Sequence, residues 1–129
     1  MDISKVEYVP GRCNIGPDEI RLRNRTGWMG LGVTAVLWVV LALVRVAPPW
    51  MLFLFLPSAM AAAGFLQGAF RFCAGFGMRG VFNFGSVGTT ETVEQAEFRR
   101  KDQARGRLIM VLSFLAGAVV AAVGVITAR

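Results

Sequence analysis

Three long apolar stretches dominate this sequence and carry almost no charge. They cover residues 27–46, 50–70 and 108–128, and Arg45 is the one charged residue inside them. Each stretch has about 20 residues, the length that a helix needs to cross a hydrocarbon core of about 30 Å. A helix of a soluble protein would instead carry polar residues along one face. The sequence therefore predicts an all-α integral membrane protein with three transmembrane helices.

The polar segments around these spans complete the predicted organisation. Residues 1–26 form an N-terminal arm, whose second half is an interfacial helix that continues into the first span. Two prolines, Pro48 and Pro49, cannot continue a helix, so the second span returns antiparallel beside the first. Residues 71–107 form a loop followed by a short helix, which a capping box at Thr92 is expected to start.

The basic residues gather on one side of the predicted membrane. They flank the start of the first span and fill the segment between the second and third spans: Arg21, Arg23, Arg25, Arg71, Arg79, Arg99, Arg100, Lys101, Arg105 and Arg107. Arg45 and Arg129 fall on the other side. The positive-inside rule then predicts a multi-pass protein of the cell (cytoplasmic) membrane, with its N-terminus in the cytoplasm and its C-terminus outside.

The composition of the chain disfavours several classes of function. The net charge is +6, and the bases flank apolar blocks, which favours an anionic membrane surface over nucleic acid. The chain has no histidine, the commonest general base and metal ligand, and it shows no pair of residues suited to catalysis. We therefore expect no enzymatic activity and no cofactor. An excess of arginine over lysine is typical of a GC-rich bacterial or archaeal genome.

Small residues recur at four-residue spacing on two of the spans. Gly64 and Gly68 lie on the second span, and Ser113, Gly117 and Ala121 lie on the third. Such spacing lets helix backbones approach closely in a bilayer. These residues are predicted to pack helices together, either within the chain or against another subunit.

The two cysteines, Cys13 and Cys73, are both predicted on the cytoplasmic side. Each has basic neighbours, which would favour the thiolate form. Two thiols are too few for a closed zinc site in one chain, although a dimer would supply four. One hypothesis is a thiol or metal site at these positions. The other is a pair of small, half-buried apolar residues.

A cluster of bases precedes the third span. It comprises Arg99, Arg100, Lys101, Arg105 and Arg107. These side chains either bind anionic lipid head groups or only fix the orientation of the chain, and the two roles are compatible.

The segment 70–88 alternates phenylalanine with glycine, which disfavours a long regular helix. Its phenylalanines are predicted to contact a protein partner or the N-terminal arm, or to form an aromatic belt at the membrane surface. The candidates for partner contact are Phe72, Phe76, Phe82 and Phe84.

These patterns favour a structural role. The leading hypothesis is a small accessory subunit of a membrane complex, which acts through helix packing and through contacts on the cytoplasmic face. Its partners would be the lipid bilayer and either another membrane protein or a second copy of the chain. The alternatives are a component of a homo-oligomeric channel or transporter, and a thiol-binding or metal-binding membrane protein that uses Cys13 and Cys73.

Overall fold

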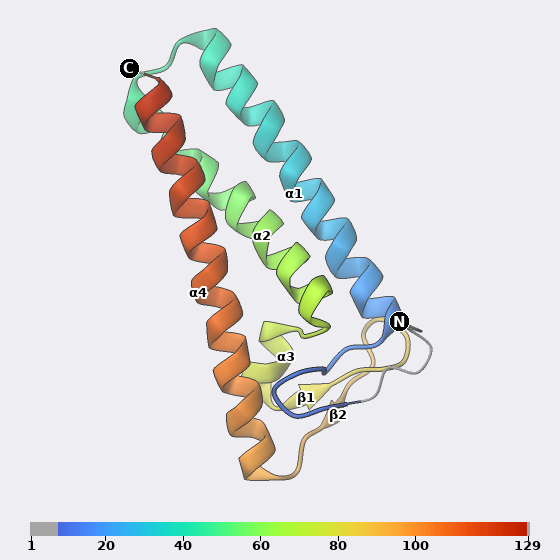
Figure 1. Cartoon of the computed structure of the whole chain (residues 1–129). Coiled ribbons are helices and arrows are strands. Elements are labelled where there is room, and N and C mark those ends of the chain that lie inside the picture. The colour runs from blue at the N-terminus through green and yellow to red at the C-terminus, as the bar shows by residue number, and fades with distance from the viewer. Residues whose placement is uncertain (1–7, 129) are drawn as a thin grey trace.

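A computed structural model describes residues 8–128 of the chain (Figure 1). Its elements are α1 (Pro17–Val44), the 3₁₀ helix η2 (Pro48–Leu54), α2 (Phe55–Phe70), α3 (Ala74–Arg79), β1 (Val81–Phe82), β2 (Glu91–Thr92) and α4 (Ala96–Thr127). Three helical segments, Pro17–Val44, Pro48–Phe70 and Ala96–Thr127, are long and apolar enough to cross a membrane. The fold is therefore mostly helical and consistent with a multi-pass membrane protein.

Helix α1 begins where its sequence favours a start. Gly16 is the N-cap, Pro17 occupies the first turn, and Asp18 and Glu19 place negative charge at the positive end of the helix dipole. The helix predicted in the second half of the arm continues into the first apolar stretch, as expected, because α1 runs unbroken from this turn to Val44. It ends at Val44, and the C-cap residue Arg45 adopts a left-handed conformation with φ of 57°.

Helix α4 begins later than the sequence predicts. Thr92 was expected in a capping box, but it lies in β2 and pairs with Val81 of β1. The N-cap is Gln95, whose side chain makes no capping hydrogen bond. The neighbouring Val93 amide donates to the Gly80 carbonyl at 2.7 Å, so backbone pairing holds this segment extended until Ala96. The predicted short helix and the third span then form one continuous helix.

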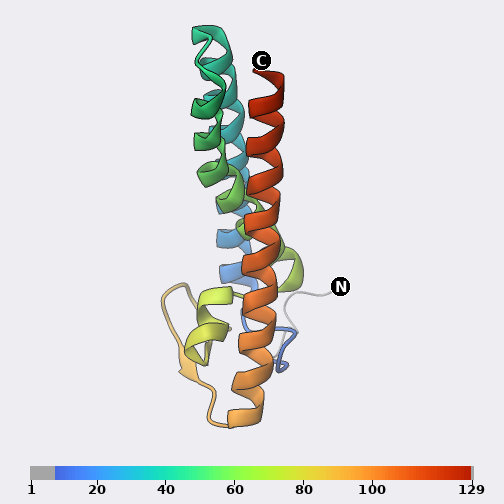
Figure 2. The same ribbon diagram turned by 90° about the vertical axis from the view of Figure 1, so that its left-hand side faces the viewer.

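The three spanning segments form a layer with α2 in the middle. Helix α2 packs against α1 on one side and against α4 on the other, and Figures 1 and 2 show α1 and α4 on opposite sides of it. These helices approach closely where one of them carries a glycine, which has no side chain. A Cβ atom at Gly64 of α2 would lie 2.5 Å from the amide nitrogen of Gly27, and one at Gly30 of α1 would lie 2.8 Å from that of Ala61.

A small folded unit lies at one end of this layer, and we call it the cap. It comprises the arm residues 8–16, the first turn of α1, α3, the β1–β2 pair with its connecting loop, and the first turns of α4 (Figure 1). The 45–47 connection and the last described turn of α4 lie at the opposite end. The cap brings together segments that are far apart in the sequence, so it is the place to look for a functional site.

Candidate functional site

Backbone hydrogen bonds fix the arm between α2 and the β1 strand. Cys13 pairs with Val9 across a tight turn, and Gly11 in that turn has φ of 71°. The amide of Asn14 then donates to the Arg71 carbonyl at 3.0 Å. Asn83, which follows β1, donates to the Asn14 carbonyl at 2.9 Å and accepts from the Gly16 amide at 2.8 Å. The arm therefore joins the end of α2 to the β1–β2 pair.

The side chain of Asn14 is the polar centre of this junction and has no exposed surface. Its Oδ1 accepts from the Cys73 amide at 2.7 Å, and its Nδ2 donates to the Cys73 carbonyl at 3.1 Å. One asparagine thus satisfies both backbone groups of the residue that precedes α3. Leaving such groups unpaired inside a protein is costly, so Asn14 holds the α2–α3 connection in place.

A second buried polar group connects α1 to the loop between β1 and β2. Glu19 is 2% exposed and forms an ion pair with Arg23 at 3.2 Å, one helical turn away. It also accepts a hydrogen bond from Asn83 Nδ2 at 3.1 Å. Arg23 Nη2 in turn donates to the Cys73 sulfur at 3.0 Å. The carboxylate is therefore neutralised and hydrogen-bonded, as a buried charge must be.

A third buried group, Asp102 of α4, fixes the tip of the arm. Asp102 has no exposed surface, and its two carboxylate oxygens accept from the Tyr8 hydroxyl and the Gly11 amide, both at 2.7 Å. Burial and the adjacent Asp102 carboxylate both raise the pKa of the Tyr8 hydroxyl. One turn further along α4, Arg105 Nε donates to the Gly11 carbonyl at 2.9 Å.

The two cysteines are both buried and unbridged, and they have different surroundings. Cys73 packs in an apolar cluster with Ile15, Ile20 and Phe76. Cys13 Sγ donates to the Ile15 carbonyl at 3.7 Å, and burial raises the pKa of its thiol. For Cys13 this is the opposite of the thiolate that its basic neighbours predicted. Within residues 8–128, no three His, Cys, Asp or Glu side chains are grouped to hold a metal ion.

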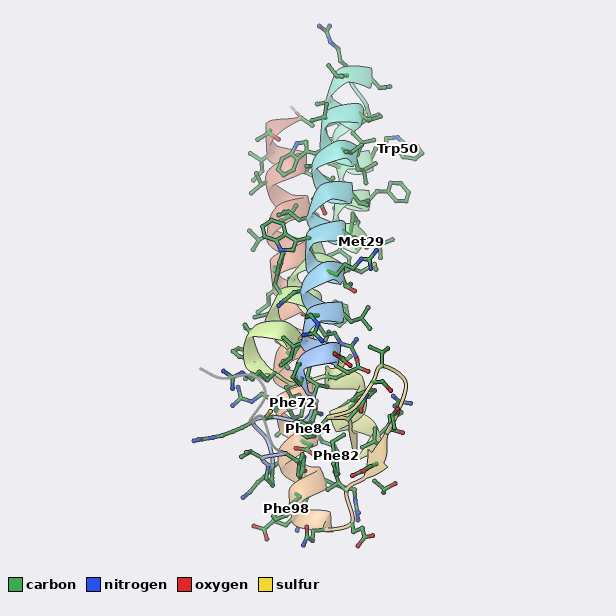
Figure 3. All side chains as sticks on the ribbon, turned by 90° about the vertical axis from the view of Figure 1, so that its right-hand side faces the viewer. Met29, Trp50, Phe72, Phe82, Phe84 and Phe98 are labelled. Carbon is green, nitrogen blue, oxygen red and sulfur yellow. The ribbon has the colours of Figure 1, made fainter. Side chains whose placement is uncertain are left out.

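The four phenylalanines predicted to contact a partner lie in or beside the cap, and contacts within the chain occupy them. Phe72 is fully buried against Ile109 of α4, and Phe76 is 8% exposed. Phe82 stacks on Tyr8 with ring centroids 4.7 Å apart and lies 5.9 Å from the ring of Phe84. Figure 3 shows Phe72, Phe82, Phe84 and Phe98 gathered at this end of the molecule. Of the three explanations offered for the Phe/Gly segment, contact with the arm is the one that these distances support.

The basic cluster before the third span divides into two groups. Arg99 and Arg105 are half-buried and bonded within the chain: Arg99 donates to the carbonyls of Val93 and Glu94 at 2.8 and 2.7 Å, whereas Arg105 contacts Gly11. The exposed group is Arg100, Lys101 and Arg107. Among residues 8–128, these three side chains donate no hydrogen bond to a backbone carbonyl, so their charge faces the surroundings.

The small residues predicted to pack helices all lie buried inside the layer. Gly64 and Gly68 of α2 face α1, where Cβ atoms at these positions would meet Gly27 and the Asn24 side chain. A Cβ at Gly117 of α4 would lie 2.9 Å from that of Ala59 in α2. Ser113 and Ala121 are buried on the same helix as Gly117. All five therefore lie on faces that pack inside this chain.

Sequence reasoning missed the buried polar residues of the cap, namely Asn14, Glu19, Asn83 and Asp102, and the basic residue Arg12. Asp102 offered a weak signal, because it is an acid within a run of bases. Asn14 offered another, because it stands between Cys13 and Ile15. Neither signal identifies a hydrogen-bond partner about 60 to 90 residues away, since such pairing depends on the folded chain.

The polar groups of the cap are engaged with one another. Within residues 8–128, every buried side-chain nitrogen or oxygen has a hydrogen-bond partner. The arrangement therefore holds a folded unit together at one end of the three long helical segments. No protein-family model, curated protein or solved structure shows a significant match to this chain.

Proposed function

We propose that this chain is a small structural subunit of a membrane complex, which binds a neighbouring transmembrane helix through the outer face of α1. The observation that carries the proposal concerns Gly32. A Cβ atom added there would have no heavy atom within 4 Å. At the other glycines of the apolar stretches 27–46, 50–70 and 108–128, the added atom would lie 2.9 Å or less from a neighbour: Gly27, Gly30, Gly64, Gly68, Gly117 and Gly124.

The outer face of α1 around Gly32 has the shape that a second helix needs. Met29, Val33, Val36 and Val40 surround the glycine and form a shallow groove of about 610 Å³. Met29 is 63% exposed and Val36 is 65% exposed, and Figure 3 shows Met29 projecting away from the layer. Glycine weakens a helix interior by about 1 kcal/mol relative to alanine. Close approach of another helix would offset that loss, because small residues permit it.

The buried polar groups of the cap form hydrogen bonds with one another, which favours a structural role over a catalytic one. Its buried carboxylates, Glu19 and Asp102, each accept hydrogen bonds that fix one segment to another. The thiol of Cys73 also accepts a hydrogen bond, from Arg23. In the proposed function these groups position the cap beside the membrane, where it contacts the cytoplasmic side of the complex.

The test compares two substitutions by leucine at different positions of α1. Gly32→Leu fills the groove, whereas Ala35→Leu adds similar bulk at an exposed position outside it. The tagged chain is extracted gently from its native membrane, and the co-purifying proteins are quantified by mass spectrometry. We expect a partner in fixed ratio with the wild type and with Ala35→Leu, and at least a tenfold loss of it with Gly32→Leu.

Two results would contradict the proposal. If the wild type and both variants are purified as monomers, the chain has no bound partner. A partner retained equally by both variants is not bound at the groove. If the wild type emerges as a homo-oligomer that Gly32→Leu dissociates, the groove binds a second copy of the chain, and the homo-oligomeric channel becomes the function to test by ion flux in liposomes.

We further propose that the cap lies in the cytoplasm and that the chain resides in the cell membrane. Eleven described bases lie in the cap or in the helix ends beside it: Arg12, Arg21, Arg23, Arg25, Arg71, Arg79, Arg99, Arg100, Lys101, Arg105 and Arg107. At the other end, Arg45 is the base among the described residues. This asymmetry supports the orientation by the positive-inside rule.

A pair of fusions tests this orientation. Alkaline phosphatase, which is active only outside the cytoplasm, is fused to the C-terminus of the full chain in one form and to residue 90, in the cap loop, in the other. We expect activity only from the C-terminal fusion. Activity from the residue-90 fusion alone would reverse the topology.

A further inference from the structure

The turn at the tip of the arm lies against α4 and leaves a basic cleft between them. The cleft has a volume of about 450 Å³ and is lined by the turn residues 10–12 and by one face of α4. Its charged lining residues are all cations, namely Arg12, Lys101 and Arg105. Sequence analysis placed two of these in the basic cluster, whereas Arg12 joins them only because the arm folds back.

The cleft is built by interactions that hold both of its walls. Asp102 accepts from the Gly11 amide on one side of the turn, and Arg105 donates to the Gly11 carbonyl on the other, at 2.7 and 2.9 Å. Gly11 has a positive φ, and a Cβ atom there would lie 3.2 Å from Cβ of Lys101. Glycine suits the tip of this turn, because other residues rarely adopt this φ and their Cβ atom would press on Lys101. The site is fixed before any ligand arrives.

The basic side chains of the cleft still offer positive charge and hydrogen-bond donors to a ligand. Arg105 uses Nε for the Gly11 carbonyl, and a guanidinium carries five donors. Its guanidinium carbon also lies over the Phe70 ring, 5.3 Å from the ring centroid, which helps to hold the side chain in place. Lys101 has Glu97 at 3.9 Å, but both side chains are more than half exposed, and an exposed pair of this kind is weak. Both oxygens of Asp102 are already occupied by Tyr8 and Gly11.

The position of the cleft along α4 indicates which anion it binds. Leu108, the first residue of the charge-free part of α4, is also part of its lining. Lys101, Ala104, Leu108, Val111 and Leu115 follow one another at spacings of three or four residues, so they form one stripe along the helix. The apolar members of the stripe within the span are exposed by 45 to 57%. A basic site thus continues directly into an outward-facing apolar track.

We propose that this cleft binds the phosphate of an anionic phospholipid whose acyl chain lies along Leu108, Val111 and Leu115. Phosphate oxygens pair with Arg12, Lys101 and Arg105, which matches the preference of guanidinium groups for planar, multidentate recognition of phosphate. An acidic peptide or a free phosphate would use the cations, but neither uses the apolar track. The site does not depend on the proposed function, because its residues lie on α4 and the arm rather than on the outer face of α1.

The test measures lipid binding to the full chain in detergent by native mass spectrometry. The probes are dioctanoyl phosphatidylglycerol and dioctanoyl phosphatidylcholine, which share their acyl chains. We expect the wild type to bind the anionic lipid at least fivefold more tightly. Arg12→Gln and Lys101→Gln are each expected to weaken that binding about fivefold, which corresponds to about 1 kcal/mol per base. Arg100→Gln removes the same charge from an exposed position outside the cleft, so its binding should equal that of the wild type.

Three results would overturn the proposal. Equal affinity for the two lipids would mean that the cleft does not recognise an anionic head group. An equal loss in Arg100→Gln would mean that general surface charge, and not the cleft, attracts the lipid. Displacement of the lipid by soluble glycerol phosphate at the same concentration would mean that the cleft binds phosphate without using the apolar track. Far-UV circular dichroism of each variant measures its helix content and so checks that the fold is retained.

Discussion

Replacing Gly64 by leucine will separate α1 from α2 and unfold the layer. A Cβ atom at position 64 would lie 2.5 Å from the Gly27 amide nitrogen and 2.7 Å from the Arg23 carbonyl oxygen. Both neighbours are backbone atoms of α1, so they cannot rotate away as a side chain can. Overpacking usually costs about 1–3 kcal/mol, and a clash between two backbones falls at or above the upper end. We expect a loss of at least about 3 kcal/mol in the free energy of unfolding.

Tryptophan fluorescence during titration with a denaturing detergent measures this loss. Trp28 of α1 contacts Phe65 of α2 edge to face, with ring centroids 5.2 Å apart, so its emission changes when the two helices part. The matched control is Gly32→Leu, which makes the same change on α1 where an added side chain meets open space. We expect the control to unfold at the same detergent fraction as the wild type or slightly above it, because leucine favours a helix more than glycine does. Equal destabilisation by both variants would show that loss of glycine, and not the contact at position 64, is responsible.

The positions of these glycines show how far sequence reasoning reaches. The four-residue spacing of Gly64 and Gly68 predicts a close helix contact, and the structure places both against α1. The matching glycines on α1, Gly27 and Gly30, are three residues apart and lack that spacing. A sequence pattern describes one helix face at a time. It does not say which faces meet, because that depends on the path of the whole chain.

The same limit explains why the three long apolar helical segments are predicted well and the cap is not. A span is defined by about 20 consecutive apolar residues, so local composition is enough to locate it. The cap depends on pairs such as Asn14 with Cys73 and Gly11 with Asp102, which are 59 and 91 residues apart. Its β1–β2 pair contains two residues in each strand and has no periodicity to recognise. Hydrogen bonds between distant residues determine this part of the fold, and the spacing of residues in the sequence does not predict them.

Replacing Asn14 by leucine will open the cap while leaving the spans folded. Leucine has nearly the shape of asparagine, but it leaves the Cys73 amide without a partner. The Cys73 carbonyl loses the bond from Asn14 and keeps the one from the Gly77 amide at 2.9 Å. A buried amide left unpaired costs about 1–3 kcal/mol, and the loss of the second hydrogen bond costs about 1 kcal/mol more. Because Cys73 directly precedes α3 and packs against Ile15 of the arm, that cost falls on the junction of these two segments. We expect a local opening free energy lower by about 3 kcal/mol.

The reactivity of the Cys73 thiol measures this opening. Cys73 is 6% exposed, so a maleimide reagent reaches it only when the cap opens. In a Cys13→Ser background, which leaves one thiol to report, we expect Asn14→Leu to raise the labelling rate about 100-fold, as a change of about 3 kcal/mol implies. Thr90→Leu changes an exposed residue of the cap loop and should leave the rate unchanged. An unchanged rate in Asn14→Leu would mean that other contacts hold the arm, whereas loss of Trp28–Phe65 contact in the same variant would mean that cap and spans unfold together.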